Sequence, residues 1–461
     1  MNILDKKILS VILKLKRFLF FFSYHVGVKL KTRNKLVNTK TCEYEFFESL
    51  SSDLKTEFIL EKINLLLNYA NKHVPYYSKI FVDLGWVDSK DCEINIEALQ
   101  KLNELPILTK RLIRENFKDL QSDEIENLNA YKNSSGGSTG EKAIFFQNDS
   151  YKIGHTSAYN AFLKKIGLKP WSKNFLLLWG SPDDIGKPTL PKNIIKHYLF
   201  NNHVLLNASD IDDTQLETLS RILQVVSFDY IRGYSQSLFL LARYINKNNI
   251  HIKQNIVIST ATNLTNEMAI EISQAFNCEL YDFYGSREVG AISYSKFDQN
   301  NNIFCLNNFV ELLQDYDSYN DLNSGKILTT NLNNFVMPLI RYDIGDNASW
   351  LGKFNYYNFD KITGRSSSFF KLKNGKRVDG VSLNHLMNEL DEIQYFQIIQ
   401  EDYDLIKFKI VSDNKINSVK TSNIENVFSR IFGETCSFLW EYIDEIPLTS
   451  SGKRIYIISK I

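Results

Sequence analysis

The chain has 461 residues, of which 44% are hydrophobic and 23% are charged, and this composition excludes a disordered protein. Its length exceeds the number of residues that one hydrophobic core ordinarily holds, so we expect two or more domains. The net charge of +1 gives no overall field that would attract nucleic acid. The five cysteines are scattered and lack C-x-x-C spacing, which argues against a zinc site or a disulfide framework and favours reduced thiols in the cytoplasm.

The N-terminal segment, residues 1–40, departs from this even balance, because it carries ten Lys and Arg residues against the single acid Asp5. Its apolar run over 18–28 is too short to span a bilayer, and no small-residue cleavage site follows it. Two interpretations stay open. The segment could lie on the inner face of the membrane as a peripheral contact, or its apolar face could dock on the main domain.

Two helical regions are predicted next. Apolar residues recur at helical spacing in residues 53–82, and Pro75 is predicted to end that helix. The stretch 105–117 is predicted to be a loop that enters a helix, with Thr109 as its N-cap.

The stretch SSGGSTGEK, residues 134–142, is the most unusual local composition in the chain. Small side chains would let consecutive N–H groups point into one concavity that holds a polyphosphate, whereas an isolated Gly/Ser run is more often a mobile surface turn. The spacing from Gly136 to Gly140 is one residue short of a P-loop, and no Ser or Thr follows Lys142.

Short β-type runs (175–179 and 255–260) then alternate with helical periods (216–226 and 237–245), which predicts α/β layers around a largely buried sheet. The last part of the chain has strand-like runs and one helix, typical of a compact α+β unit of about 100 residues. We therefore predict three parts: the segment 1–40, a large nucleotide-binding domain 41–363 and a small C-terminal lid domain 364–461.

Four further motifs follow the glycine loop: YDFYGSREVG (281–290), RYDIGD (341–346), ITGRSSSFF (362–370) and PLTSSGK (447–453). Each is weak by itself. In this order and at these intervals they resemble the adenylate-forming (AMP-binding) superfamily, and most closely its branch of phenylacetate–CoA ligases and CapK capsular polysaccharide proteins. The resemblance extends from about Phe58 to the C-terminus.

The resemblance implies a large multi-layered α/β domain with a small mobile α+β domain at the C-terminus. It also implies ATP- and Mg²⁺-dependent conversion of a small carboxylic or amino acid to acyl-AMP. The acyl group would pass to CoA, a carrier thiol, or a sugar or amine acceptor, in surface polysaccharide biosynthesis if the chain acts like CapK. Two alternatives remain: a phenylacetate–CoA ligase type of acid–thiol ligase in aromatic acid metabolism, and a nucleotide-binding member of a polysaccharide assembly complex that has lost turnover.

The resemblance also assigns roles to residues. Lys453, Glu288 and Thr139 would be catalytic, and Glu288 would also bind Mg²⁺, for which a hard carboxylate is suitable. The residues expected to contact ATP or AMP are Ser135, Gly136, Gly137, Ser138, Thr139, Gly140, Asp282, Tyr284, Gly285, Ser286, Arg287, Asp346 and Arg365. Among them, Tyr284 would face adenine, and Asp346 would accept hydrogen bonds from the ribose hydroxyls.

Three positions depart from the family pattern. Arg287 stands where Thr or Ser usually precedes the metal-binding acid, Ser367 replaces the acidic hinge, and Lys142 stands where many relatives have proline.

Other residues have open or structural interpretations. Trp179 and Tyr234 could line the binding site of the acid substrate, or they could belong to the hydrophobic core. We interpret His155 and His197 as structural histidines with satisfied hydrogen bonds.

Overall fold

The computed structural model describes the chain in sections. These are residues 32–134, 143–170, 174–179, 203–207, 213–225, 227–261, 264, 266–314, 324–350, 354–362, 369–373, 377–379, 386–387, 390, 392–393, 395–412, 414–433, 435–446 and 457–461.

The N-terminal part of the described chain is helical: α2 (Thr32–Ser49), α3 (Ser52–His73), α4 (Pro75–Asp83), the 3-10 helix η1 (Leu99–Glu104) and α5 (Lys110–Glu115). The helical stretch predicted for 53–82 divides at Val74, because Pro75 cannot continue α3 and instead occupies the first turn of α4. The predicted N-cap is confirmed, since the Thr109 hydroxyl accepts a hydrogen bond from the Leu112 N–H at 3.2 Å.

A sheet of eight strands forms the centre of the large domain, in the order β13-β9-β8-β7-β6-β5-β3-β4. Its members are β3 (Phe175–Trp179), β4 (His203–Asn207), β5 (Tyr230–Tyr234), β6 (Ile256–Thr260), β7 (Glu279–Ser286), β8 (Gly290–Lys296), β9 (Asn301–Ile303) and β13 (Asn358–Phe359). Strands β4, β3, β5, β6 and β7 are parallel, whereas β8, β9 and β13 are antiparallel to their neighbours. The two strands predicted within this part, β3 and β6, are confirmed.

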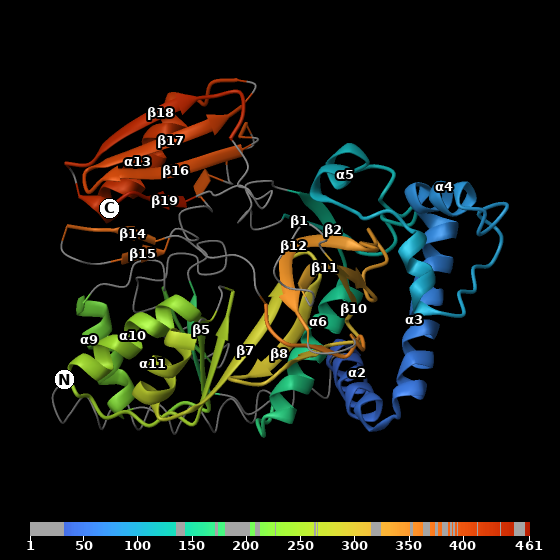
Figure 1. The fold of residues 1–461 in the computed structure, drawn as a ribbon, viewed down its shortest axis with the longest axis horizontal. Helices are drawn as coiled ribbons and strands as arrows, with labels where there is room; N and C mark the ends of the chain where they lie inside the picture. Colours follow the sequence, from blue (N-terminus) through green and yellow to red (C-terminus); the bar gives the residue numbers. More distant parts are fainter. Residues whose placement is uncertain are drawn as a thin grey trace.

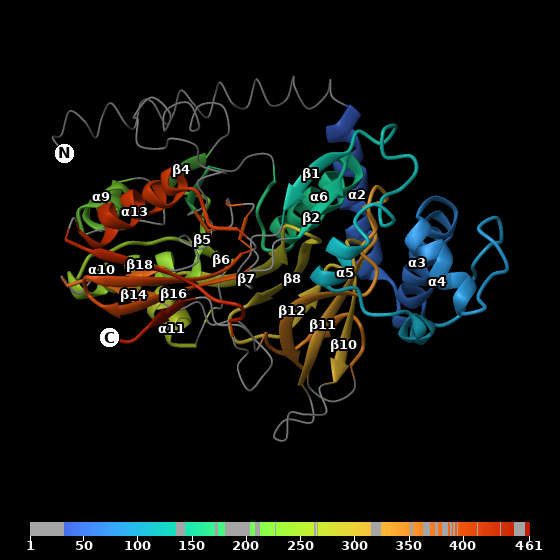
Figure 2. The same ribbon diagram turned by 90° about the horizontal axis from the view of Figure 1, so that it is seen from above.

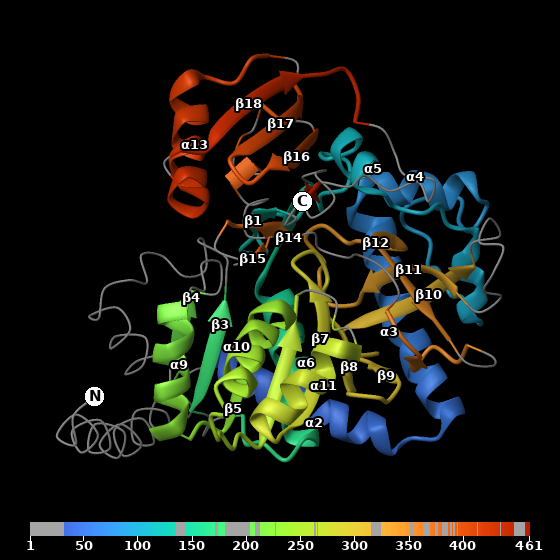
Figure 3. The same cartoon turned by 60° about the vertical axis from the view of Figure 1, so that its left-hand side comes forward.

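Helices cover both faces of this sheet, as predicted. Helices α9 (Asp213–Val225), α10 (Ser235–Lys247) and α11 (Asn266–Phe276) pack on one face and share a core with it (Figure 3). Helix α6 (Asp149–Lys165) covers the other face, where Phe162 contacts the rings of Tyr281 and Phe283. Helix α2 packs against α6 from outside.

Two smaller β elements flank the sheet in the large domain (Figures 1 and 2). The antiparallel sheet β10-β11-β12 consists of β10 (Asn308–Gln314), β11 (Ser324–Asn331) and β12 (Tyr342–Ser349). The hairpin of β1 (Tyr131–Ser134) and β2 (Ile144–Gln147) brackets the glycine loop.

The C-terminal part forms a separate α+β layer with its own hydrophobic core, which runs from Phe370 to Ile457 (Figure 1). Its sheet has the order β18-β17-β16-β19, made of β16 (Tyr395–Asp402), β17 (Leu405–Val411), β18 (Ser437–Tyr442) and β19 (Ile457–Ser459). Helix α13 (Ser418–Phe432) packs on it through Phe428, whose ring meets that of Phe408. A short hairpin, β14 (Phe369–Lys371) and β15 (Arg377–Asp379), lies beside it.

Parallel strands of the large sheet run toward the C-terminal domain (Figure 3). Their carboxyl ends therefore meet at one edge of the sheet, which is where α/β proteins usually bind ligands. Within the described residues no helix is long and apolar enough to cross a membrane. The predicted boundary at 363/364 stays a prediction, because residues 363–368 lie outside the described residues.

Candidate functional site

The turn that carries Glu288 joins β7 to β8, and two glycines determine its shape. A Cβ at Gly285 would overlap the carbonyl oxygen of Gly290 across the turn, and Gly290 itself has a φ of +73°. Only glycine accepts this close approach and this conformation without strain. The YGSREVG motif therefore encodes a tight turn with a bulge at Tyr284 and Gly285.

Within this turn the Glu288 side chain is nearly buried, with 5% of its surface exposed. Its Oε1 atom accepts a hydrogen bond from the Tyr342 hydroxyl at 3.3 Å. Tyr342 is the first residue of β12, so two of the predicted motifs meet at this carboxylate. No group of three or more His, Cys, Asp or Glu side chains gathers to hold a metal ion in the described part of the chain. A cation bound at Glu288 would have to complete its coordination with oxygens of a ligand.

A cluster of buried asparagines holds the same turn from behind. Asn307 and Asn308 donate to the carbonyl of Ala291 at 2.7 and 2.6 Å, and Asn331 donates to the carbonyl of Val289 at 2.9 Å. All three side chains are fully buried. Sequence reasoning missed this cluster, although asparagine pairs inside apolar surroundings, at 307–308 and 333–334, are a signal that could have found it.

The hairpin that flanks the glycine loop contacts the same turn. The Gln147 amide of β2 donates to the carbonyls of Arg287 at 2.7 Å and Glu288 at 3.2 Å. The Tyr151 hydroxyl of α6 also donates to the Arg287 carbonyl at 2.7 Å. The glycine-loop residues 135–142 lie outside the described residues, and among them are the predicted contacts Ser135 to Gly140 and also Lys142. Among the described residues, the hairpin contacts the Glu288 turn through Gln147, which pairs with Tyr131 at the end of the hairpin away from the glycine loop.

Asp346 joins the site from β12. The Tyr284 hydroxyl donates to Asp346 Oδ2 at 2.7 Å, and the Asp346 residue is 7% exposed. A bridge between Ala348 and Ile362 places the start of the ITGR motif two residues further along the same strand. Arg365 and Ser367 lie outside the described residues, as do Lys453 and His197.

Three predicted motifs therefore lie close together in the described structure, and the hairpin that brackets the glycine loop contacts the same turn through Gln147. The roles assigned to all these residues stay predictions.

Asp282 lies on the opposite face of β7 from Phe283, beside a pair of buried serines. Desolvation raises the pKa of its carboxyl to about 7, and a hydrogen bond with Ser259 opposes part of that rise. The Ser259 and Ser235 hydroxyls lie 2.8 Å apart. The Asp282 carboxyl therefore titrates near neutral pH, and its titration makes the free energy of unfolding depend on pH.

We expect Asp282→Asn to stabilise the fold by about 1–2 kcal/mol at pH 8, with a smaller gain at pH 5. The folded-state pKa lies above the unfolded value, so the contribution of Asp282 is fully present below about pH 4 and is lost as the pH rises through 7. Urea unfolding at both pH values measures the difference. Asp298→Asn, on the exposed turn after β8, is the matched control; an equal gain there, or the same gain at both pH values, would contradict the assignment.

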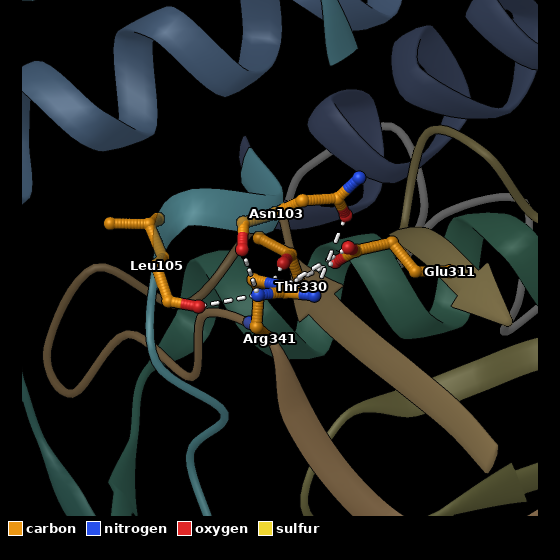
Figure 4. Close-up of polar contacts among 5 residues, drawn as sticks. All are labelled: Asn103, Leu105, Glu311, Thr330 and Arg341. Atoms are coloured by element: carbon orange, nitrogen blue, oxygen red, sulfur yellow. Dashed lines mark hydrogen bonds and ion pairs between the residues drawn. The ribbon is translucent and has the colours of Figure 1, made fainter. Parts of the chain in front are cut away.

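The strand that carries Tyr342 and Asp346 is anchored by Arg341 (Figure 4). The Arg341 Nε atom donates to Glu311 Oε1 at 3.0 Å, and both side chains are almost fully buried. Its Nη1 atom donates to the carbonyls of Asn103 and Leu105, and its backbone N–H donates to the Thr330 hydroxyl. The first residue of the RYDIGD motif is thus a structural anchor for the next five.

One histidine prediction is wrong. His155 of α6 was expected to have its hydrogen bonds satisfied, but its Nδ1 atom is buried and has no partner among the described residues. Desolvation and the nearby charge of Arg232 lower the pKa of His155 to about 4, so the ring is neutral at pH 7. Whether a buried ring nitrogen finds a hydrogen-bond partner depends on contacts with distant segments, which a single sequence does not show.

Trp179 and Tyr234 end adjacent parallel strands, with ring centroids 4.9 Å apart. Tyr234 is buried and Trp179 is half-buried. The two interpretations of these rings are compatible, since they pack on each other at the edge where parallel strands end.

Comparisons with known proteins agree with this arrangement. The family profile of the CapK C-terminal domain matches residues 370–460. Protein CapK of Staphylococcus aureus is 26% identical over 416 residues, which cover 86% of this chain and 87% of CapK. The chain is therefore similar to CapK over most of its length. The resemblance inferred from the motifs is confirmed.

Solved structures confirm the fold of this protein. A 2-hydroxyisobutyryl-CoA ligase with 2-HIB-AMP and CoA, in its thioesterification state, superimposes with a TM-score of 0.56 at 13% identity. The match covers 89% of this chain and 91% of the ligase. The same ligase with R3-HIB-AMP, in its postadenylation state, gives a TM-score of 0.54 at 12% identity. Both share the combination of a large α/β domain and a small C-terminal domain.

Proposed function

We propose that this protein activates a small carboxylic or amino acid with ATP, forming acyl-AMP and pyrophosphate. The observation that carries the proposal is that several contacts meet at the turn between β7 and β8. The Gln147 amide donates to the Glu288 carbonyl, and the Tyr342 hydroxyl donates to the Glu288 carboxylate. Asp346 lies beside this turn and accepts from the Tyr284 hydroxyl. Two sequence motifs, YDFYGSREVG and RYDIGD, thus bring a nearly buried glutamate and a nearly buried aspartate to one place, as a shared ligand would require. The similarity to CapK and to the adenylate-forming ligases supports this choice of chemistry.

The residues present fit ATP and Mg²⁺. Glu288 offers a nearly buried carboxylate with a single described hydrogen bond, and a hard oxygen ligand of this kind suits Mg²⁺ held jointly with phosphates. When bound, the cation would neutralise negative charge on the phosphate oxygens. Asp346, oriented by Tyr284, presents a carboxylate that suits the two hydroxyls of a ribose.

In this proposal the acid's carboxylate attacks the α-phosphorus of ATP, and pyrophosphate leaves. The glycine loop, Ser135 to Gly140, holds the departing phosphates with its N–H groups and hydroxyls, and Arg365 contacts the ribose or a phosphate. Lys453, delivered by the C-terminal domain, neutralises charge as the two anions approach. Arg287 replaces the usual Thr or Ser beside Glu288, and its backbone carbonyl is held by Gln147 and Tyr151, which leaves the turn's geometry in place.

The acyl acceptor is the finer part of the proposal. The fold shared with a ligase whose structures contain an acyl-AMP and CoA supports CoA or a carrier thiol as the acceptor. The likeness to CapK supports a sugar or amine acceptor in surface polysaccharide biosynthesis, with residues 1–40 near the membrane. A phenylacetate–CoA ligase activity is the alternative within the same chemistry. The lid role of residues 364–461 belongs to the proposal as well.

ATP–pyrophosphate exchange with a panel of small carboxylic and amino acids tests the proposal. We expect at least one acid to support exchange, and we expect Lys453→Ala to lower it about 100-fold because the developing charge then lacks its counter-ion. Lys460→Ala is the matched control, since Lys460 lies in the same C-terminal stretch but pairs with Glu401 at the surface. ATP binding by folded protein without exchange for any acid would favour the turnover-deficient alternative. Equal rates for both lysine variants would remove Lys453 from the mechanism.

A further inference from the structure

A half-buried arginine lies on the α6 face of the large sheet, outside the constellation described above. Arg232 is the third residue of β5, between its neighbours β3 and β6. The guanidinium carbon lies 4.6 Å from the Tyr159 ring centroid, 5.1 Å from that of Phe283 and 5.7 Å from that of Trp179. Three aromatic rings from three different elements thus surround one positive charge.

This charge has no anionic partner within the described residues. No residue that the structure describes forms an ion pair with Arg232, and its Nε atom is buried without a hydrogen bond to any of them. Contact with aromatic rings stabilises a desolvated cation by about 2 kcal/mol. Removing a cation from water costs several kcal/mol, which is more. Charges that are withdrawn from water in proteins are usually paired. Arg232 is half-buried and its Nε atom is buried, so an anion that arrives with a ligand is a favourable partner for it.

Helix α6 connects this arginine to the turn of Glu288. Tyr151, His155 and Tyr159 are spaced four residues apart, so they follow one face of the helix. Tyr151 bonds to the Arg287 carbonyl at one end, and Tyr159 lies against Arg232 at the other. A Cβ built on Gly290 would lie 3.1 Å from His155 Nδ1, which places His155 between them. The helical rise makes the separation from His155 or Tyr151 to Tyr159 about 6–12 Å, comparable with a small extended acid.

The other polar groups along this path do not supply a negative charge. His155 is neutral because burial and Arg232 lower its pKa to about 4. The Tyr159 hydroxyl donates to Tyr230 at 3.2 Å, and burial raises the pKa of Tyr230 well above its ordinary value. Thr260, at the end of β6, donates its hydroxyl to the Phe283 carbonyl at 2.8 Å. The path therefore has one cation, aromatic walls and no competing carboxylate among the described residues.

We propose that Arg232 binds a second anionic group of the acid substrate, at the end opposite the carboxylate that becomes adenylated. A carboxylate suits the position, because the planar guanidinium can donate two parallel hydrogen bonds to it. The substrate class is then a short dianionic acid rather than a simple fatty or aromatic acid. This inference rests on the proposed adenylation function.

Exchange kinetics with length-matched acid pairs test the inference: succinate against butyrate, glutarate against valerate, and adipate against hexanoate. We expect the wild-type protein to prefer the dianionic member of at least one pair by 10-fold or more in kcat/KM. Arg232→Gln should lower kcat/KM for that diacid by 10- to 100-fold, mainly through KM, and leave the monoacid nearly unchanged. Arg243→Gln is the matched control, because Arg243 lies over a single ring on the exposed side of α10 and should change neither.

Two results would overturn the inference. A wild-type preference for the monoacid in every pair excludes a dianionic substrate. An equal loss for both members in Arg232→Gln would mean that Arg232 binds the reacting carboxylate or supports the fold.

Thermal denaturation with the same acids, in the absence of ATP, separates this inference from the proposed function. Stabilisation of wild type by a diacid, absent in Arg232→Gln but present in Arg243→Gln, supports anion binding even if no acid supports exchange. Exchange with monoacids but no stabilisation by any diacid refutes the inference while the adenylation proposal survives. The melting temperature of ligand-free Arg232→Gln shows whether the variant is folded. If it is not, Arg232→Lys replaces it, with a partial loss expected for the diacid alone.

Discussion

Glu288→Gln is expected to lower the rate of ATP–pyrophosphate exchange about 100- to 1000-fold and to leave the fold intact, because it removes the carboxylate of the β7–β8 turn that we propose to hold a divalent cation. The amide keeps the size of the carboxylate and can still accept from the Tyr342 hydroxyl. The turn is held by its two glycines and by the asparagine cluster rather than by the Glu288 side chain. We therefore expect this variant to lose exchange activity and to keep the stability of the wild-type protein.

A matched control and a titration sharpen that test. Glu279→Gln changes the same type of side chain on the same strand, where it is exposed and paired with Lys296, and should leave exchange unchanged. Raising the Mg²⁺ concentration should recover part of the Glu288→Gln rate if the lost function is cation binding. Unaltered exchange, or a melting temperature that falls with the rate, would contradict the assigned role.

Arg341→Met is expected to destabilise the protein by about 3–5 kcal/mol, because it leaves the buried Glu311 carboxylate without its counter-charge. It also leaves the carbonyls of Asn103 and Leu105 without a donor (Figure 4). Urea unfolding measures the loss. Burial already raises the pKa of Glu311 against the opposing effect of Arg341, so the variant should take up a proton at this carboxyl.

The double variant Arg341→Met with Glu311→Leu provides the internal check. Removing both charges should recover 1 kcal/mol or more, since an apolar pair of similar volume avoids the stranded carboxylate. Arg111→Met, at an exposed site 3.8 Å from Glu115, should cost less than about 0.5 kcal/mol. A loss at Arg341 no larger than at Arg111, or a double variant as unstable as the single one, would show that the ion pair does not anchor β12.

Local features of the sequence predicted local structure well. The Thr109 cap, the break at Pro75 and the strands at 175–179 and 255–260 depend on neighbours within a few residues, and the structure confirms them. The adenylate-forming resemblance came from short motifs in order, and their glycines and acids carry most of the candidate site.

Contacts between segments that are far apart in the sequence could not be predicted from such local features. The asparagine cluster requires residues from 307 to 331 to lie behind the turn at 288, and a single sequence carries no distance between them. His155 was predicted to be a structural histidine with satisfied hydrogen bonds, but its Nδ1 atom has no partner among the described residues, which depends on what packs against it. Arg232 attracted no attention in the sequence, since an arginine in a strand is ordinarily solvated.

The sequence by itself determined the resemblance to CapK and the layered α/β class, and it predicted the carboxylates at 288 and 346, because glycine conformations, caps and motif order are local properties of the chain. Only the tertiary structure decided that the Glu288 turn is held by asparagine amides, that β12 is anchored through Arg341, and that Arg232 is enclosed by three rings. The physical reason is that burial and pairing of charge depend on which strands and helices meet, and the order β13-β9-β8-β7-β6-β5-β3-β4 arises only when the whole domain packs.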